Sequence, residues 1–297
     1  MVTKTITSNW NRLKYRVPLI LEGFNPLYFQ GKPLDPLSHV QLQMNDKSYQ
    51  RNYDIFKDRV INAIGKKYLP IYRMADGEFN FILNLSKIPT INNILTLIGI
   101  KKNKTCWGEN FTFWELEKIK VLYFKQLKII SQKGFLANHF IDFSDGKHHP
   151  YFKTFKSISK KFEKHNIIFN ETNYTSFYYV YALLTGNDRE LILRNKNILI
   201  ITSFDEVKKA NLLKFLVNDE NASSVDFYKI SATKSMFDKI DFKQLKPTYD
   251  LVLIGAGIGS SNILVQCEKL KTVSIDAGIV LERYANRELK YSRIFLL

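Results

Sequence analysis

The C-terminal third of the sequence alternates between short apolar runs and longer segments with helical spacing, and this alternation restricts the fold more than any other feature. The runs are rich in Ile, Val and Leu, as buried strands are. The predicted strands cover residues 197–202, 224–230, 249–254 and 272–275, and the predicted helices cover residues 205–217 and 260–270. Strands that alternate with helices form parallel sheets with helices on both faces. We therefore predict an α/β fold with a Rossmann-like, mostly parallel, doubly wound sheet.

The earlier part of the chain adds further elements to this sheet. The predicted strands there cover residues 69–74 and 134–140, and the predicted helices cover residues 47–64, 79–85, 114–130, 152–162 and 174–184. Residues 1–46 contain four prolines among scattered aromatic residues, a pattern typical of irregular structure. We predict an N-terminal irregular or helical arm at residues 1–46, packed on a single α/β domain at residues 47–297.

The charge balance favours anionic partners. Lys and Arg outnumber Asp and Glu by 44 to 28, which gives a net charge of +16. Such a charge attracts nucleic acids, anionic lipids and phosphorylated substrates alike. The basic residues are spread along the whole chain, and the sequence contains no recognisable nucleic-acid-binding motif. We expect no nucleic-acid partner, and we keep a non-enzymatic protein that binds nucleic acid or an anionic surface as an alternative hypothesis.

The cysteines and the apolar runs bear on the compartment. Cys106 and Cys267 are the two cysteines of the 297-residue sequence, too few for a disulfide framework. No run approaches the roughly 18 apolar residues of a membrane helix, and we find no signal peptide. We expect a cytoplasmic protein, with peripheral contact to the inner face of the plasma membrane as an open alternative.

The strongest local signal for chemistry is the sequence Arg-Met-Ala-Asp-Gly-Glu at residues 73–78. Asp76 and Glu78 flank Gly77, which lets the backbone turn tightly, so both carboxylates can approach one hard cation such as Mg²⁺ or Mn²⁺. Arg73 could then bind a phosphate with its guanidinium fork. The structural alternative is that Asp76 caps a helix and that Asp-Gly forms an ordinary turn.

A second signal is a glycine-rich turn after the predicted strand at residues 249–254. Gly257, Gly259, Ser260 and Ser261 stand at the start of a predicted helix, where backbone N–H groups and hydroxyls can hold a phosphate. Asp276 ends the next predicted strand, about where a dinucleotide-binding fingerprint has its ribose-binding acid. A Rossmann-type enzyme that uses NAD or another nucleotide cofactor is therefore an alternative, although Ser260 stands where that fingerprint has glycine.

The loop after the predicted strand at residues 197–202 is a third candidate. Its sequence Ser-Phe-Asp-Glu fits a capping box in which Ser203 caps the helix and Glu206 reaches back. Open α/β sheets bind ligands at the carboxyl ends of their strands. Thr202, Ser203 and Asp205 are therefore also candidates for the lining of the pocket.

The motif at residues 73–78, followed by the glycine turn and by Ser-Ile-Asp-Ala-Gly-Ile at residues 274–279, resembles the GT-D-fold bacterial glycosyltransferases. In that family an Arg-x-x-Asp-Gly-Glu segment supplies the Asp-x-Glu pair that holds a divalent cation and, through it, a nucleotide-sugar diphosphate. By resemblance, Asp76 and Glu78 are the metal and donor-site pair, and Arg73 supports them. The family's Asp-x-Gly-His ending is similar to residues 276–279, where Ile279 replaces the histidine.

The resemblance implies a glycosyltransferase, of hexosyltransferase type, that depends on Mn²⁺ or Mg²⁺. The expected donor is a UDP-sugar, and the expected acceptor is a glycan, glycolipid or glycoprotein of bacterial surface polysaccharide biosynthesis. The predicted catalytic residues are Asp76, Glu78 and Asp276, and Asp276 and Asp142 are the two candidates for a general base. The residues predicted to bind the nucleotide sugar are Arg73, Gly257, Gly259, Ser260, Ser261 and Ser203. A homodimer is a further open expectation.

Overall fold

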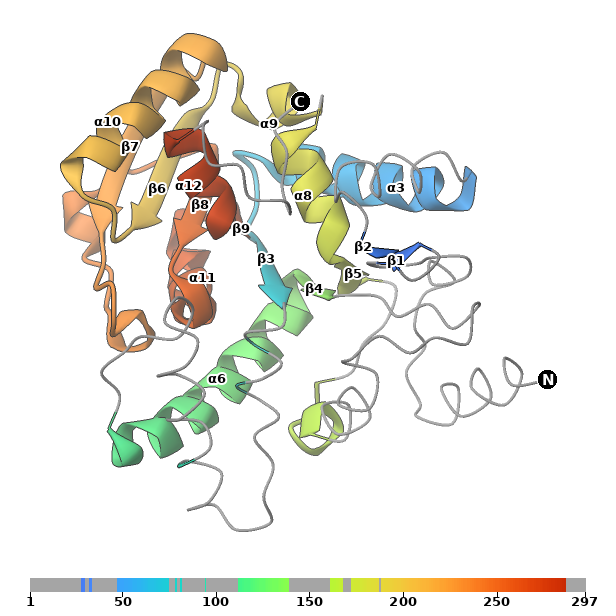
Figure 1. Cartoon of the computed structure of the whole chain (residues 1–297), viewed down its shortest axis with the longest axis vertical. Coiled ribbons are helices and arrows are strands. Elements are labelled where there is room, and N and C mark those ends of the chain that lie inside the picture. The colour runs from blue at the N-terminus through green and yellow to red at the C-terminus, as the bar shows by residue number, and fades with distance from the viewer. Residues whose placement is uncertain are drawn as a thin grey trace.

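A computed structural model of the chain contains a seven-stranded sheet with helices on both faces (Figure 1). The structure describes residues 47–74, 112–138, 161–167, 172–186 and 188–286, together with Glu78, Phe81, Ile94 and two short strands near the N-terminus. Several predictions lie wholly or mostly outside these residues: the arm at 1–46, the helices at 79–85 and 152–162, and the site residues Asp76 and Asp142.

All strand pairs in the large sheet are parallel. The strand order is β5-β4-β3-β9-β8-β6-β7. The strands are β3 (Leu69–Met74), β4 (Phe135–Asn138), β5 (Tyr174–Ser176), β6 (Asn197–Thr202), β7 (Ser224–Lys229), β8 (Leu251–Gly255) and β9 (Val273–Asp276). A separate antiparallel pair is formed by β1 (Tyr28–Phe29) and β2 (Lys32–Pro33). The predicted α/β class with a parallel, Rossmann-like sheet is confirmed.

Helices cover both faces of this sheet. They are α3 (Lys47–Ala63), α6 (Phe113–Lys133), α8 (Phe177–Thr185), α9 (Arg189–Leu193), α10 (Glu206–Lys214), α11 (Ser260–Gln266) and α12 (Ile279–Ala285). Helices α6 and α11 pack together on one face, whereas α3, α8, α12 and α10 follow one another across the other face (Figure 1). The sheet is therefore doubly wound, as the alternation of strands and helices predicts.

The core follows the apolar runs. The side chains from Ile198 to Ile201 in β6 and from Leu251 to Ile254 in β8 are fully buried, because helices cover both faces of these strands. Between β3 and α6, the hydroxyls of Tyr72 and Tyr123 lie 3.0 Å apart and satisfy each other inside the core. Strand β3 is thus fixed against α6 by packing and by a buried polar contact.

Two of the predicted helices differ from the structure. The helix predicted at residues 174–184 begins only at Phe177, because Tyr174–Ser176 pairs with β4 as the edge strand β5. The helix predicted at residues 205–217 is capped by Asp205, whose side chain accepts a hydrogen bond from the Lys208 N–H at 2.9 Å. The capping box predicted on Ser203 is therefore wrong, since the helix begins two residues later than that box requires.

Two short helices are among the elements that the sequence did not predict. Helices α9 and α12 have five and seven residues, too few to show a clear apolar period. The helix predicted at residues 260–270 ends as an α-helix at Gln266 and continues as a 3₁₀ turn to Leu270. None of the helices in the described part of the chain is long and apolar enough to cross a membrane.

Candidate functional site

The candidate site lies at the point of the sheet where the order of the strands reverses. From β3 the chain adds β4 and β5 on one side, whereas β6 to β9 fill the other side, so β3 and β9 adjoin where the two halves of the sheet meet. Ligands of open α/β sheets bind outside the carboxyl ends of the strands at such a point. Arg73 stands near the carboxyl end of β3, and Asp276 ends β9.

Arg73 and Asp276 contact each other at this edge. The Arg73 Nε–H donates a hydrogen bond to the main-chain carbonyl oxygen of Asp276, with 2.5 Å between the heavy atoms. The Nη2 atom of Arg73 lies 4.0 Å from the Oδ1 atom of the Asp276 carboxylate. Both side chains are almost completely buried. The pair therefore joins the ends of two neighbouring strands by a charge-assisted contact inside the protein.

Aromatic rings cover the Arg73 guanidinium. Its central carbon lies 4.7 Å from the ring centroid of Tyr181 and 5.4 Å from that of Phe177, both on α8. Burial works against the charged form, but Tyr181, Asp276 and Glu78 outweigh it and raise the pKa of Arg73 above its ordinary value. The Nη1 atom of Arg73 is buried and has no hydrogen-bond partner among the residues that the structure describes. An unsatisfied buried donor of a charged group is costly, so this nitrogen has a binding capacity that an anionic ligand could use.

The carboxyl group of Asp276 is buried, and neighbouring groups partly stabilise its charged form. Burial raises the pKa of its carboxyl group, while Arg73 and the hydroxyl of Ser260 act in the opposite direction. The Ser260 Oγ donates a hydrogen bond to the Oδ1 atom of Asp276 at 2.9 Å. Asp276 is thus held from two sides, by β3 and by the turn that follows β8.

Glu78 belongs to the same neighbourhood. It is buried and in helical conformation, and its charge helps to raise the pKa values of Tyr72 and Tyr123. Asp276 acts on the same two phenols. The structure therefore brings Arg73, Glu78 and Asp276 together, as the sequence motifs predict, while Asp76 and Gly77 lie outside the described residues.

The glycine turn after β8 has a different role from the one expected of its serines. Ser260 and Ser261 are fully buried. The Ser260 hydroxyl bonds to Asp276, and the Ser261 hydroxyl donates to Gln126 Oε1 of α6 at 2.8 Å. Both hydroxyls are engaged inside the protein, so this geometry does not favour them as phosphate ligands. Their role in the described structure is to fix the turn and helix α11 against β9 and α6.

Glycine is required at two positions beside this site. Gly278, directly after the Asp276-Ala277 pair, has a φ of +48°, and a β-carbon there would lie 2.0 Å from Arg73 Nη2. A β-carbon on Gly259 would lie 1.9 Å from the Oγ atom of Ser235. Gly278 thus allows the backbone to turn close under the guanidinium, which favours glycine for a packing reason as well as a conformational one.

The third candidate loop lies farther along the sheet. Strand β8 separates β6 from β9, so Ser203 and Asp205 follow a strand that is two positions away from Asp276. Thr202, at the end of β6, is fully buried, and its Oγ1 atom has no hydrogen-bond partner in the described part of the chain. Asp205 is exposed and caps α10. The structure therefore separates these residues from the Arg73–Asp276 pair.

Sequence reasoning missed the tyrosines around the site. Tyr181 faces Arg73, and Tyr72 and Tyr123 lie within the electrostatic range of Glu78 and Asp276. No spacing in the sequence distinguishes Tyr181 from the other aromatic residues of α8. Only the crossing of α8 over β3 identifies it.

The described carboxylates do not form a complete metal site by themselves. Among the residues that the structure describes, no group of three or more His, Cys, Asp or Glu side chains lies in an arrangement that could hold a metal ion. Asp76 is outside that set. A cation at this edge would therefore depend on Asp76 and on oxygens from a substrate.

A pocket at the opposite edge of the sheet does not resemble an anion site. Its lining residues are Arg189, Glu190, Arg194, Asp219, Glu220 and Asn221. Arg189 Nε lies 2.8 Å from Glu220 Oε1, and Arg194 pairs with Glu190. The basic groups of this pocket are thus already paired.

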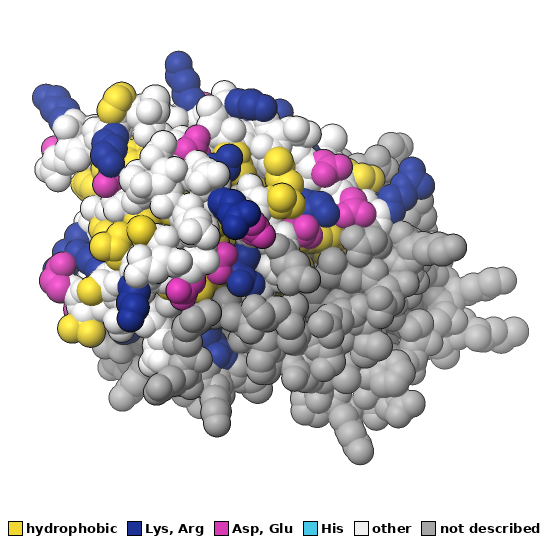
Figure 2. Space-filling model, turned by 90° about the horizontal axis from the view of Figure 1, so that it is seen from above, with side chains coloured by type: hydrophobic (Ala, Val, Ile, Leu, Met, Phe, Trp, Pro, Cys, Tyr) yellow, Lys and Arg dark blue, Asp and Glu magenta, His cyan; other side chains and the backbone are white. Residues whose placement is uncertain are grey.

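On the face of the molecule seen in Figure 2, basic side chains are dispersed among acidic and apolar ones.

Comparison with known proteins agrees with the fold. Residues 143–284 match the family model of the GT-D fold-like domain. This match covers slightly less than half of the chain. The matched GT-D-like segment contains the glycine turn and Asp276, whereas Arg73 and the Asp-Gly-Glu motif precede it. No curated protein matches the chain in sequence.

Two solved structures are similar to this chain over most of its length. One is of the domain of unknown function 1792, described as having a distinct glycosyltransferase fold, with 15% identity and a TM-score of 0.44 over 82% of this chain and 88% of that one. The other is a selenomethionine-substituted structure of the domain of unknown function 1792, with 17% identity and a TM-score of 0.42 over 83% and 88%. At these scores the two likenesses carry no weight for the activity of this chain.

Proposed function

We propose that this protein is a divalent-metal-dependent glycosyltransferase of hexosyltransferase type. It would move a sugar from a nucleotide-diphosphate donor, with a UDP-sugar as the donor we favour, to a bacterial surface glycan, glycolipid or glycoprotein. The observation that carries this proposal is the contact of Arg73 with Asp276 at the carboxyl edge, where β3 adjoins β9 and where Glu78 lies close by. The GT-D-like match of residues 143–284 supports the same class of enzyme.

The side chains at this edge suit a hard cation bound together with a diphosphate. Asp76 and Glu78 would hold Mg²⁺ or Mn²⁺, since these ions prefer oxygen ligands and commonly take one or two carboxylates plus substrate phosphates. The buried Nη1 atom of Arg73 has no hydrogen-bond partner among the described residues and would donate to an anionic oxygen. When bound, the cation would supply positive charge that stabilises the departing diphosphate.

The residues of the chain would perform the remaining tasks. In the transfer, the bond between the sugar's anomeric carbon and the diphosphate oxygen breaks, and a bond to the acceptor hydroxyl oxygen forms. The acceptor's proton must pass to a base, and the nucleoside diphosphate leaves. Asp276 is our candidate for that base, because burial raises the pKa of its carboxyl group and thereby its affinity for a proton.

The dinucleotide alternative has less support at the same residues. The dinucleotide fingerprint requires glycine where Ser260 stands, and the Ser260 hydroxyl instead donates a hydrogen bond to the Oδ1 atom of Asp276. Binding of NAD in the absence of metal would instead support this alternative.

The test is the thermal stability of the full chain with UDP, GDP, CMP or NAD, each with Mn²⁺ or with EDTA. A ligand that binds only the folded state stabilises it by about 2.7 kcal/mol at a hundredfold excess over its Kd. We expect stabilisation by one nucleoside diphosphate in the presence of Mn²⁺ and its loss with EDTA. Release of that diphosphate from its nucleotide sugar on addition of an acceptor then tests transfer itself.

The matched variants are Asp76→Asn and Asp58→Asn. Asp58 is exposed on α3, an element that supplies none of the described site residues. We expect Asp76→Asn to abolish the Mn²⁺-dependent stabilisation and Asp58→Asn to retain it. Stabilisation by NAD without metal, or an unchanged response in a folded Asp76→Asn variant, would contradict the proposal.

A further inference from the structure

Helix α6 exposes apolar side chains on the face that it turns away from the sheet. Its inner face is fully buried through Leu116, Ile119, Tyr123 and Leu127. Its outer face carries residues at helical spacing that are open to solvent. This exposed face of α6 consists of Trp114, Lys118, Val121, Leu122 and Lys125.

The degree of exposure is unusual for such residues. The side chains of Trp114 and Val121 are 75% and 68% exposed, and Leu122 is also exposed. Single exposed apolar residues are common, but an exposed tryptophan beside exposed aliphatic side chains on one helix face is typical of a contact surface. Lysines at two of the five positions give this surface a positive charge.

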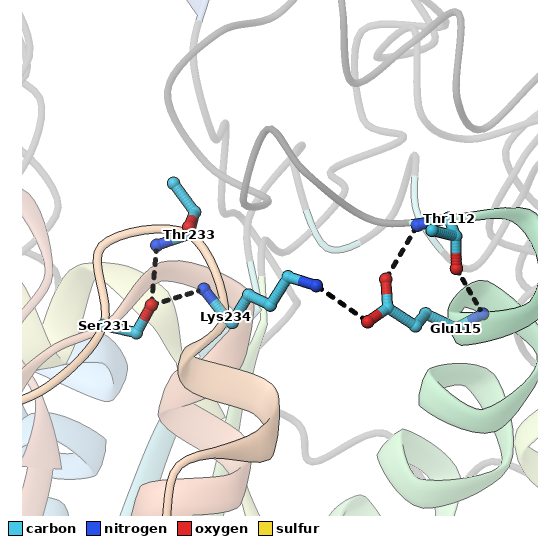
Figure 3. A network of polar contacts seen from close by, with 5 residues as sticks. All are labelled: Thr112, Glu115, Ser231, Thr233 and Lys234. Atoms are coloured by element: carbon cyan, nitrogen blue, oxygen red, sulfur yellow. Dashed lines mark hydrogen bonds and ion pairs between the residues drawn. The ribbon is translucent and has the colours of Figure 1, made fainter.

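The start of α6 is fixed rigidly at the carboxyl edge of the sheet. Thr112 and Glu115 form a capping box, in which the Thr112 Oγ1 accepts from the Glu115 N–H and the Glu115 Oε2 accepts from the Thr112 N–H. Glu115 Oε1 also accepts a hydrogen bond from Lys234 Nζ at 2.8 Å (Figure 3). Lys234 belongs to the loop after β7, and the hydroxyl of its neighbour Ser235 donates to the carbonyl of Ala256 in the glycine turn. The exposed face therefore begins beside the loops that surround the candidate site.

The helix ends at the other edge. Gly134 follows α6 and leads directly into β4, so the 21-residue helix runs from the carboxyl edge to the amino edge of the sheet. At 1.5 Å per residue its length is about 31 Å. Trp114 is in the first turn, and Lys125 is in the fourth. Trp114 thus lies toward the carboxyl edge, nine residues before Tyr123, which is within electrostatic range of Asp276.

We propose that the exposed face of α6 docks on the surface of an anionic phospholipid bilayer. A tryptophan and aliphatic side chains that alternate with lysines suit the boundary between headgroups and acyl chains, where the ring is amphipathic and lysine stems are apolar. The net charge of +16 attracts the whole chain to an anionic leaflet. The chemistry of the face and the charge of the chain thus point to the same partner.

A second copy of the chain fits this face less well. In a two-fold dimer the same surface meets itself, so Lys118 and Lys125 would face the lysines of the partner. Like charges across an interface oppose association. Anionic headgroups instead neutralise these lysines.

Docking through α6 would lay its outer face along the membrane, so that the start of α6 brings the loops at the carboxyl edge close to the headgroups. An acceptor carried on a lipid would then be held near the site. The use of a lipid-linked acceptor rests on the proposed function, whereas lipid binding does not depend on any activity. The docking of α6 and the proposed function can therefore be contradicted separately.

The experiment is flotation of the full chain with vesicles of phosphatidylcholine alone and of phosphatidylcholine mixed equally with phosphatidylglycerol. We expect binding to the anionic vesicles only. Trp114→Ser should lower the partition coefficient about tenfold, because the aromatic side chain that would enter the bilayer is lost. Val207→Ser on α10 is the matched control, since Val207 is 71% exposed and lies on the opposite face of the sheet. It should change binding less than twofold.

Two double variants distinguish binding through the exposed face of α6 from a general attraction between the positively charged chain and the anionic membrane. Lys118→Gln with Lys125→Gln should weaken binding about tenfold, and Lys208→Gln with Lys214→Gln on α10 should weaken it far less. Equal losses in the two double variants would overturn the proposal, because net charge alone would then explain the binding. Failure of the wild-type chain to bind, or a dimer in sedimentation velocity that Trp114→Ser dissociates, would also overturn it. Circular dichroism and the melting temperature verify that each variant is folded.

Discussion

Arg73 Nε donates a hydrogen bond to the main-chain carbonyl oxygen of Asp276, while its Nη2 atom lies 4.0 Å from the Asp276 carboxylate. One guanidinium thus contacts both the backbone and the side chain of the residue that ends the neighbouring strand. Because 203 positions separate the two residues, the contact also joins the two halves of the sheet. The contribution of this contact to the free energy of unfolding, and its geometry, can be measured without knowledge of a substrate.

Loss of the Arg73 guanidinium should be strongly destabilising. Arg73→Met leaves the Asp276 carboxylate buried without its cationic partner, and breaking a buried pair in this way typically costs about 3–5 kcal/mol. In the double variant with Asp276→Asn, the cost should fall below the sum of the two single costs by at least about 1 kcal/mol. Urea denaturation at neutral pH measures all three variants. Strictly additive costs would show that the two residues do not interact.

The turn after β9 should not tolerate a side chain at Gly278. Gly278→Ala combines a positive φ with a β-carbon 2.0 Å from Arg73 Nη2, so we expect a loss of about 2–3 kcal/mol in the free energy of unfolding. Gly65→Ala is the comparison, since Gly65 also has a positive φ of +65° but its nearest neighbour is the movable carboxylate of Asp250. It should cost about 1 kcal/mol. Equal losses in the two variants would show that contact with Arg73 is unimportant.

The capping of α10 distinguishes two nearby residues. Asp205→Ala removes the side chain that accepts from the Lys208 N–H and should cost about 1 kcal/mol. Ser203→Ala should change stability by less than about 0.5 kcal/mol. Thermal unfolding of the two variants under identical conditions compares them directly. A larger effect at Ser203 would restore the capping box that the sequence predicts.

The stability of the chain should depend on Lys161 at alkaline pH. Burial, together with Lys120 and Lys164, lowers the pKa of Lys161 to about 8 from its ordinary value of 10.5. Between these two values the unfolded chain binds more protons than the folded chain, so the contribution of Lys161 to stability rises with pH. Lys161→Gln should therefore be more stable than wild type near pH 7, and this advantage should shrink toward about pH 10.

Urea unfolding of wild type and Lys161→Gln at several pH values measures that difference. Lys125→Gln, at an exposed position of α6, is the matched control for the loss of a lysine. A stability gap between wild type and Lys161→Gln that does not vary with pH would contradict the expectation.

Local patterns in the sequence were sufficient for most of the described elements. Strands β3 and β6 have the bounds that the sequence predicts, because a continuous apolar run between turn residues has few other stable conformations. Tyr174–Ser176 shows the limit of such patterns. Its three residues form an edge strand only because β4 offers them a partner, and the apolar spacing of α8 extends into them.

The sequence by itself determined the parallel α/β class and singled out Arg73, Glu78 and Asp276 as residues with chemistry, because each stands beside a turn after an apolar run. Only the tertiary structure decided that β9 lies next to β3, which brings Asp276 against Arg73. It also turned the hydroxyls of Ser260 and Ser261 inward, placed Tyr181 over the guanidinium and left Trp114 exposed. Strand order and the direction of side chains depend on packing between distant segments, which no local spacing encodes.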